Sequence, residues 1–257
     1  MRIITFNLNG IRSAAKKGFF TWLEKQDADV VCLQETKAQL EKLEGEIFRP
    51  DNYYHYFSDA QKPGYSGVGI YCRQKPDNVN HHWGWSVSDQ EGRYVQADFG
   101  PLSIISLYMP SGTSGEERQA IKWQFMEYFL EYLKKIRESN RHYIICGDWN
   151  IAHKTIDLKN WKANQKHTGF LPDERAWLDR VLNEHEWVDA FRELNKNAEQ
   201  YTWWSQRGRA REKNVGWRID YQMTTPELKN KIKAVSIYTG QNFSDHAPLI
   251  IDYELKL

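Results

Sequence analysis

The fold of this chain is decided by a pattern that is clearest in Tyr143-Ile144-Ile145-Cys146-Gly147-Asp148-Trp149-Asn150. A short, mostly apolar run, typical of a buried strand, is followed at once by acidic and amide side chains. In open α/β sheets, ligands bind at the ends of strands. The segment therefore predicts a buried strand whose end carries functional groups.

Similar runs occur along the whole chain, and each predicts a buried strand. They are Ile3–Phe6, Val30–Gln34, Val68–Cys72, Tyr94–Phe99, Leu102–Tyr108, Tyr143–Gly147, Ile219–Met223, Val235–Tyr238 and Leu249–Tyr253. Helical patterns lie between them at Gly18–Lys25, Gly115–Glu138 and Pro172–Glu186. Because strands and helices alternate irregularly, we expect an α/β fold of packed sheets flanked by helices, in one domain over residues 1–257.

The ends of the predicted strands share one chemical character. They carry mainly oxygen donors, namely Asn7, Glu35, Tyr108, Asp148, Asn150, Asp220 and Asp245, with the imidazole of His246. If these ends lie on one edge, hard oxygen ligands favour Mg²⁺ or Mn²⁺, ions that usually act on phosphate. A single acid at a strand end is more often a turn or cap residue, so this interpretation depends on convergence.

Composition excludes several classes of protein. The 257 residues include 27% charged residues and 40% hydrophobic ones, so the chain is neither disordered nor fibrous. No membrane-spanning run or signal peptide is present, and the three cysteines lie in apolar runs. We therefore expect a cytoplasmic protein with reduced cysteines.

The formal net charge of +1 conceals two basic segments. Residues 153–167 and 201–218 are rich in lysine and arginine and contain tryptophans. Such segments suit a polyanion with bases that can stack, and the alternative is a pair of solvated surface loops.

At these residues the sequence resembles the exonuclease III and AP endonuclease branch of the endonuclease/exonuclease/phosphatase superfamily. The resemblance is nearly full length and is carried by Phe6–Arg12, Leu33–Lys37, Gly64–Gly69, Gly147–His153, Gly216–Tyr221 and Ser244–Pro248. It implies a four-layered α/β sandwich of the DNase-I-like type, and a monomer. It also implies an Mg²⁺-dependent phosphodiesterase, with Mn²⁺ as a substitute, that acts on double-stranded DNA. Such enzymes cut 5′ to abasic sites and leave a 3′-hydroxyl, and many also process blocked 3′ ends as exonucleases, phosphodiesterases or phosphatases.

The resemblance assigns roles to the metal site. Glu35 matches the principal metal carboxylate, and Asn7 and Asp245 complete or adjoin that site. Asp148 matches the group that orients and deprotonates the attacking water. Asn150 matches an amide that steadies water and phosphate, and Asp148 and Asn150 also match a second metal position.

The remaining catalytic assignments leave one alternative open. His246 matches the imidazole that donates to a phosphate oxygen, with Asp220 accepting its other N–H. A different assignment makes the Asp220–His246 pair the general base. Tyr108 matches a tyrosine that hydrogen-bonds the scissile phosphate, and Gly147 is expected to allow a tight turn.

Substrate contacts follow from the same resemblance. Trp203, Trp217 and Ile219 match the walls of a pocket for a flipped-out sugar without a base, although core packing is the alternative for the tryptophans. The candidates for phosphate contacts are Lys37, Asn164, Lys166, Arg207 and Arg211. Solvated surface charge is the alternative for these side chains.

The sequence departs from the family pattern at two positions near the site, and two other functions compete with that of a DNA-repair nuclease. Asn9 stands where some relatives carry Asp, which lowers the negative charge near the metal. His167 stands where relatives often have Asn, and its larger ring is expected to favour 3′-end processing over abasic incision. The competing functions are a superfamily phosphatase or sphingomyelinase, which lacks the Trp217–Tyr221 segment, and a non-catalytic DNA-binding module, against which the intact polar set argues.

Overall fold

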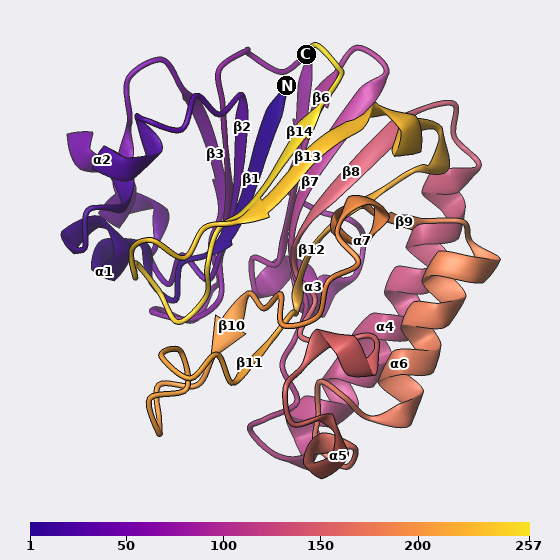
Figure 1. Cartoon of the computed structure of the whole chain (residues 1–257). Coiled ribbons are helices and arrows are strands. Elements are labelled where there is room, and N and C mark those ends of the chain that lie inside the picture. Colours follow the sequence, from indigo (N-terminus) through magenta and orange to yellow (C-terminus); the bar gives the residue numbers. More distant parts are fainter.

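The computed structural model describes residues 1–257 and has four layers, two β-sheets packed face to face with helices on both outer faces (Figure 1). The first sheet contains β1 (Arg2–Asn7), β2 (Val30–Gln34), β3 (Tyr54–Ser58), β4 (Val68–Cys72), β13 (Ile232–Ile237) and β14 (Leu249–Tyr253). The second contains β5 (Asn78–Asn80), β6 (Tyr94–Phe99), β7 (Leu102–Tyr108), β8 (His142–Asp148), β9 (Val188–Asp189) and β12 (Asp220–Thr224). Their orders are β13-β14-β1-β2-β4-β3 and β5-β6-β7-β8-β12-β9. Each sheet is mixed, because β1–β2 and β7–β8 are parallel pairs and the other pairs are antiparallel.

Helices cover the outer face of each sheet (Figure 1). The first sheet is covered by α1 (Ile11–Lys16) and α2 (Phe19–Leu23), and the second by α4 (Glu116–Arg137) and α6 (Pro172–Asp179). The other helices are α3 (Ser86–Gln90), α5 (Trp161–Asn164) and α7 (Ala190–Leu194). A small sheet of β10 (Trp203–Trp204) and β11 (Gly216–Trp217) lies at the edge of the sandwich away from the chain termini (Figure 1).

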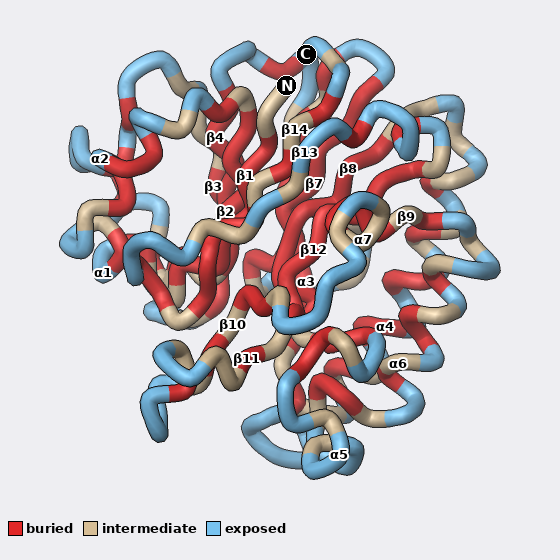
Figure 2. Tube along the Cα trace, in the orientation of Figure 1, coloured by how far each residue is buried: buried red, intermediate tan, exposed pale blue.

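The central strands β1, β2, β4, β7, β8 and β12 are buried on both faces, which explains their mostly apolar sequences. In β2, Val30 and Cys32 face the core between the sheets, whereas Val31 and Leu33 face the helices of the outer layer. This alternation follows from the two-residue period of a strand. Figure 2 shows the buried strands in the centre and the exposed loops and outer helix faces around them.

The predicted α/β class, the sandwich and each predicted element are confirmed, with small shifts at their bounds. The helix expected over Pro172–Glu186 is α-helical only to Asp179 and continues as a π-helical turn over Arg180–Glu184. The sequence missed β3, because this edge strand is largely half-exposed and lacks an apolar run. The three cysteines are free and buried. None of the helices combines the length and apolar character that crossing a membrane requires.

Candidate active site

The strand ends singled out by the sequence meet at one edge of the sandwich. Asp148 at the end of β8 is paired with Tyr108 of β7 on one side and with Asp220 of β12 on the other. In the first sheet, Asn7 of β1 is paired with Gln34 at the end of β2, so Glu35 follows beside it. Backbone pairing therefore brings the predicted groups together, as the strand-end interpretation requires.

Asn7 links the two sheets at this edge. Its Nδ2 donates to Glu35 Oε1 and to Asp148 Oδ2, both at 2.9 Å, and the side chain is completely buried. Gly147 lies within β8, where a Cβ would come within 2.0 Å of Leu107 O. The expected turn role of Gly147 is therefore corrected, because close contact between neighbouring strands is what excludes a side chain there.

The backbone turns sharply just after the strands end. Glu35, Lys37 and Asn150 have φ values of 48°, 50° and 51°, in the left-handed region. For residues other than glycine this conformation costs about 1 kcal/mol or more and is concentrated at functional sites. Asn150 is held by its N–H, which donates to Asp148 Oδ1 at 2.8 Å, and by its Nδ2, which donates to Met109 O at 2.8 Å.

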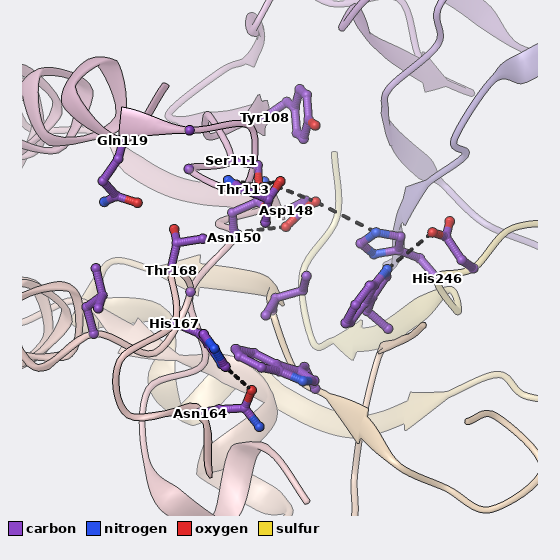
Figure 3. A pocket seen from close by; sticks show the side chains of 18 of the residues that line it. Tyr108, Ser111, Thr113, Gln119, Asp148, Asn150, Asn164, His167, Thr168 and His246 are labelled. Atoms are coloured by element: carbon purple, nitrogen blue, oxygen red, sulfur yellow. Dashed lines mark hydrogen bonds and ion pairs between the residues drawn. The ribbon is translucent and has the colours of Figure 1, made fainter. Parts of the chain in front are cut away.

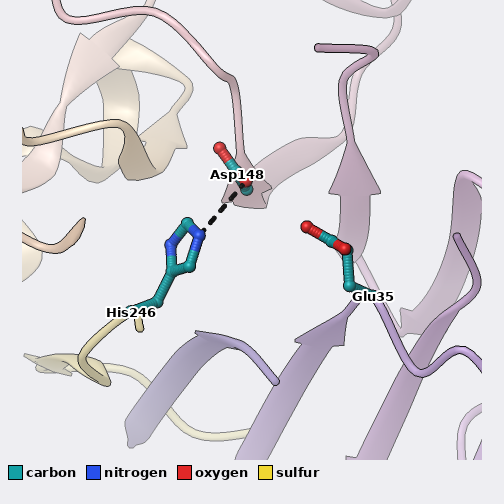
Figure 4. A group of neighbouring side chains, drawn as sticks. All are labelled: Glu35, Asp148 and His246. Carbon is teal, nitrogen blue, oxygen red and sulfur yellow. Dashed lines mark ion pairs between the residues drawn. The ribbon is translucent and has the colours of Figure 1, made fainter. Parts of the chain in front are cut away.

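A group able to hold a divalent cation lies at the centre of this edge. Glu35, Asp148 and His246 each present a ligand atom, and these atoms lie within 4.8 Å of one another (Figure 4). The carboxylates of Glu35 and Asp148, without a thiolate nearby, fit a hard cation such as Mg²⁺ or Mn²⁺, whereas the imidazole of His246 is a ligand only in its neutral form. Glu35 Oε2 also pairs with Lys37 Nζ at 2.6 Å, so a bound cation would share this carboxylate with a lysine.

Asp245 connects the same edge to an aromatic wall. Its Oδ1 accepts from Asn9 Nδ2 at 2.9 Å, and its Oδ2 accepts from Trp203 Nε1 at 3.2 Å. Asn9 Oδ1 accepts in turn from Lys37 Nζ at 2.5 Å. The predicted metal ligand Asp245 thus lies beside the Glu35 group, and both of its oxygens accept hydrogen bonds from neighbouring side chains.

His246 lies between two buried acids. Its Nδ1 is 2.9 Å from Asp220 Oδ2, and its Nε2 is 3.8 Å from Asp148 Oδ2. Burial disfavours the imidazolium, but the charge and hydrogen bond of Asp220 outweigh it, so the pKa of His246 is raised to about 10. Burial and the charge of Asp220 raise the pKa of Asp148 to about 7. The edge thus combines a charged imidazole with a carboxyl group that titrates near neutrality.

Tyr108 is supported by a residue that the sequence did not single out. Burial and the nearby Glu35 carboxylate raise the pKa of Tyr108 well above its usual value, which keeps its hydroxyl protonated. The guanidinium of Arg93 lies 4.7 Å from the centre of the Tyr108 ring, and its Nη1 donates to Tyr108 O at 3.0 Å. The only sequence signal for this buried arginine was its place directly before the apolar strand Tyr94–Phe99.

A cleft of about 780 Å³ opens over this edge (Figure 3). The predicted residues that line it are Glu35, Tyr108, Asp148, Asn150, Asn164, Lys166, Trp203, Trp217, Ile219, Asp245 and His246, together with His167. The rings of Trp203 and Trp217 pack edge to face with 6.3 Å between their centres, and both are partly exposed. They form a wall of the cleft and are not part of the inner core.

The other predicted residues lie outside the lining of the cleft. Asn7 and Asp220 are buried behind it as partners of Glu35, Asp148 and His246, whereas Lys37 is bonded to Glu35. Arg207 is exposed on the loop between β10 and β11.

Arg211, on the same loop, turns inward. Its Nη1 donates to Ser244 O at 3.0 Å, and its guanidinium lies 4.7 Å from the ring centre of Trp204. Its charge therefore supports the backbone beside His246, whereas that of Arg207 faces solvent.

One wall of the cleft has no counterpart among the predicted residues. Its members are mostly small or uncharged polar residues, namely Ser111, Gly112, Thr113, Gly115, Gln119 and Thr168, with Glu116 as the one charged residue. Most come from the loop between β7 and α4 or from the start of α4. Loop residues of this kind have no periodic pattern, so the only signal was their place soon after Tyr108.

Comparisons with known proteins agree with this geometry. Residues 4–246 match the model of the Endonuclease/Exonuclease/phosphatase family. The chain is 39% identical to the exodeoxyribonuclease of Bacillus subtilis, over 97% of this chain and 98% of that protein. It is 36% identical to the DNA repair nuclease APEX1 of Danio rerio, over 98% of this chain and 81% of that protein. It superimposes on an AP endonuclease from Archaeoglobus fulgidus with a TM-score of 0.91 and 29% identity, covering 99% and 100% of the two chains.

Proposed function

Since this chain belongs to the endonuclease/exonuclease/phosphatase family, we propose that it is a DNA-repair phosphodiesterase that cuts the backbone 5′ to abasic sites. It is a metal-dependent nuclease of the exonuclease III and AP endonuclease type. The cut leaves a 3′-hydroxyl, and the enzyme also removes blocking groups from 3′ ends. Its cofactor is Mg²⁺, which Mn²⁺ can replace, and it acts as a monomer on double-stranded DNA.

The observation that carries this proposal is the group Glu35, Asp148 and His246, whose ligand atoms lie within 4.8 Å at the edge of an aromatic-walled cleft. Glu35 would hold the cation, with Asp245 beside it and with Asp148 and Asn150 adjoining it. Asn7 would complete the site by donating to the carboxylates of Glu35 and Asp148 and so fixing their positions. When bound, the cation neutralises phosphate charge and stabilises the leaving oxygen. This donor set fits hydrolysis of a phosphodiester better than binding alone.

The protein groups divide the remaining work. Asp148 orients the attacking water and takes its proton, because a pKa of about 7 suits a general base at neutral pH. His246, kept charged by Asp220, donates to a non-bridging phosphate oxygen. The protonated hydroxyl of Tyr108 donates to the same phosphate. Because a charged imidazole cannot accept a proton, this arrangement favours Asp148 over the Asp220–His246 pair as the base.

The walls of the cleft select the substrate. A deoxyribose without a base is small and apolar on its faces, so it fits between Trp203, Trp217 and Ile219, where an intact nucleotide is too large. Asn164, Lys166, Arg207 and Lys37 contact the flanking phosphates.

One observation favours a second activity as the dominant one. The ring of His167 lines the cleft, and its Nδ1 lies 2.9 Å from Asn164 Oδ1. A ring at this position narrows the space for an abasic sugar inside a continuous strand, whereas a terminal 3′-phosphate needs less room. In that case the enzyme is mainly a 3′-phosphatase and exonuclease with weak abasic incision.

The test uses a duplex with a central abasic-site analogue, labelled at the 5′ end of the damaged strand. With Mg²⁺ we expect one cut immediately 5′ to the lesion, which EDTA and Asp148→Ala both abolish. Glu131→Gln, on the exposed face of α4, is the control and should cut normally. An uncut strand, together with release of phosphate from a 3′-phosphate duplex, would contradict abasic incision and establish the 3′-processing activity.

A further inference from the structure

A buried ion pair lies behind the cleft, outside the set of residues to which the proposed mechanism assigns a role. Lys122 Nζ of α4 is 2.6 Å from Glu174 Oε1 of α6, and both side chains have no exposed surface. Removing two charges from water costs several kcal/mol per ion, and an apolar pair of similar size is often as stable. Stability alone therefore does not explain why charges occupy this place.

Glu174 binds the segment that carries one wall of the cleft. Its Oε2 accepts from the backbone N–H groups of Gly169 and Leu171 at 2.6 and 3.0 Å, and its Oε1 accepts from Thr168 Oγ1 at 3.2 Å. The Glu174 carboxylate thus holds the C-terminal half of the segment 164–171, which includes His167. This segment has no strand pairing of its own, so the bonds to Glu174 hold its backbone together with the turn hydrogen bonds from His167 N to Asn164 O and from Phe170 N to His167 O.

Lys122 joins that carboxylate to the catalytic edge. Its Nζ also donates to Asn150 O at 2.9 Å, two residues beyond Asp148. The wall is packed closely against the same point, because a Cβ on Gly169 would lie 3.2 Å from both Asn150 O and the ring of Trp217. Ala152 N donates to Gly169 O at 2.8 Å, which ties the segment to the chain after β8.

We propose that Lys122 and Glu174 are positioning residues that hold the wall of residues 164–171 at a fixed distance from Asn150, and that this distance governs which DNA lesion fits the cleft. The inference rests on the proposed function and adds to it a determinant of specificity that does not touch the substrate. A lysine is suited to this task, because one ammonium group donates both to the carboxylate and to the strand-end carbonyl.

The test compares wild type with Lys122→Met and with the neutral double variant Lys122→Met/Glu174→Gln, which remains informative if the unpaired Glu174 of the single variant prevents folding. Leu133→Ala, a buried residue of the same helix, is the control for lost stability without a change in the wall. Two quantities are measured. One is amide hydrogen exchange of residues 164–171, and the other is the ratio of kcat/KM for abasic incision to kcat/KM for removal of a 3′-phosphate.

We expect exchange of residues 164–171 to become faster in both pair variants while β8 stays protected. The activity ratio should change by about tenfold, less than the roughly hundredfold loss that a misplacement of about 1 Å can cause. Leu133→Ala should lower Tm and leave the ratio within about twofold of wild type. Unchanged exchange, or faster exchange with an unchanged ratio, would overturn the proposal. A wild-type enzyme inactive on both DNA substrates would contradict the proposed function, and exchange would still decide whether the pair holds the wall.

Discussion

The base of the cleft and its walls hold their side chains by different means. At the base, Tyr108 and Asp148 occupy paired positions of neighbouring strands, so backbone hydrogen bonds fix their separation. In the walls, His167 lies in a loop that side-chain contacts hold, and beyond the walls Arg207 lies on an exposed loop outside the lining of the cleft. We therefore expect substitutions at the base of the cleft to remove turnover, and substitutions in its walls to change which substrate is turned over.

The largest effect on activity is expected from a substitution at the base of the cleft. Asp148→Asn keeps the shape of the side chain but removes the charge that accepts a proton from water, so kcat should fall by about 10³-fold, within the usual contribution of a general base. Substrate affinity should change little, because the walls remain intact. Single-turnover incision and DNA binding measured in parallel test this, and a loss of binding equal to the loss of rate would show that base and walls are not separable.

The next largest effect is on stability, and it concerns a buried ion pair beside the cleft residues Trp217 and Ile219. Asp157 Oδ1 accepts from Arg218 Nε at 2.8 Å and from Arg192 Nη2 at 2.7 Å, and Arg218 adjoins the cleft residues Trp217 and Ile219. Asp157→Asn removes the carboxylate that Arg192 and Arg218 share and leaves Arg218 paired with Asp189 alone, so the free energy of unfolding should fall by about 3 kcal/mol, as for other broken buried pairs. Denaturation in urea measures this.

The same carboxylate makes part of the stability depend on pH. Burial by itself raises the pKa of Asp157, but Arg218 and Arg192 outweigh burial and lower it to about 2. Because the folded-state pKa lies below the unfolded one, the contribution is complete above about pH 4 and is lost as pH falls towards 2. The difference in stability between wild type and Asp157→Asn should therefore shrink over that range, and a constant difference would contradict the role of the charge.

The contrast between base and walls also explains what could be predicted from the sequence. Val30–Gln34 and Leu102–Tyr108 were predictable because strands buried on both faces are mostly apolar, and the polar groups of Gln34, Glu35 and Tyr108 mark where these strands end. That Glu35 and Asn150 adopt a left-handed backbone could not be predicted, because the hydrogen bonds that hold such a turn come partly from distant segments, as Met109 O does for Asn150.

The same limit applies to the direction in which a side chain points. Lys37 and Arg211 are both candidates for phosphate contacts from the sequence, yet Lys37 bonds to Glu35 and to the distant Asn9, and Arg211 bonds to the distant Ser244 O. A count of cations cannot separate them from Arg207, which remains exposed.

The identity of the general base that deprotonates the attacking water can be tested by the pH dependence of the rate. If Asp148 accepts the proton, kcat/KM should fall tenfold per pH unit below about 7, and bound Mg²⁺ should move this limb to lower pH by stabilising the carboxylate. If the Asp220–His246 pair were the base, activity would require neutral imidazole and would keep rising to about pH 10. Initial rates measured across the pH range, at low and at saturating Mg²⁺, distinguish the two general bases. Only Asp148 as the base predicts that kcat/KM at low Mg²⁺ rises to its plateau near neutral pH.

A smaller effect is expected from His167 in the wall. His167→Asn removes ring volume but keeps a polar group near Asn164, so abasic incision should rise by about tenfold while the 3′-phosphatase rate stays within about twofold. Both rates are measured on matched duplexes that differ only in the lesion. No change in either rate would show that His167 does not narrow the cleft.

The smallest effect compares two arginines of one loop. Arg207→Gln should raise KM for duplex DNA about threefold and reduce the slope of log kcat/KM against log salt by about one, as expected for one lost phosphate contact. Arg211→Gln should leave that slope unchanged and lower kcat, because Arg211 supports the backbone of Ser244 and His246. Lys256→Gln, in the exposed C-terminal residues, is the control for a general loss of charge. Equal salt slopes for Arg207→Gln and Arg211→Gln would mean that both arginines face the DNA. This result would contradict the assignment of Arg211 to the support of Ser244 and His246.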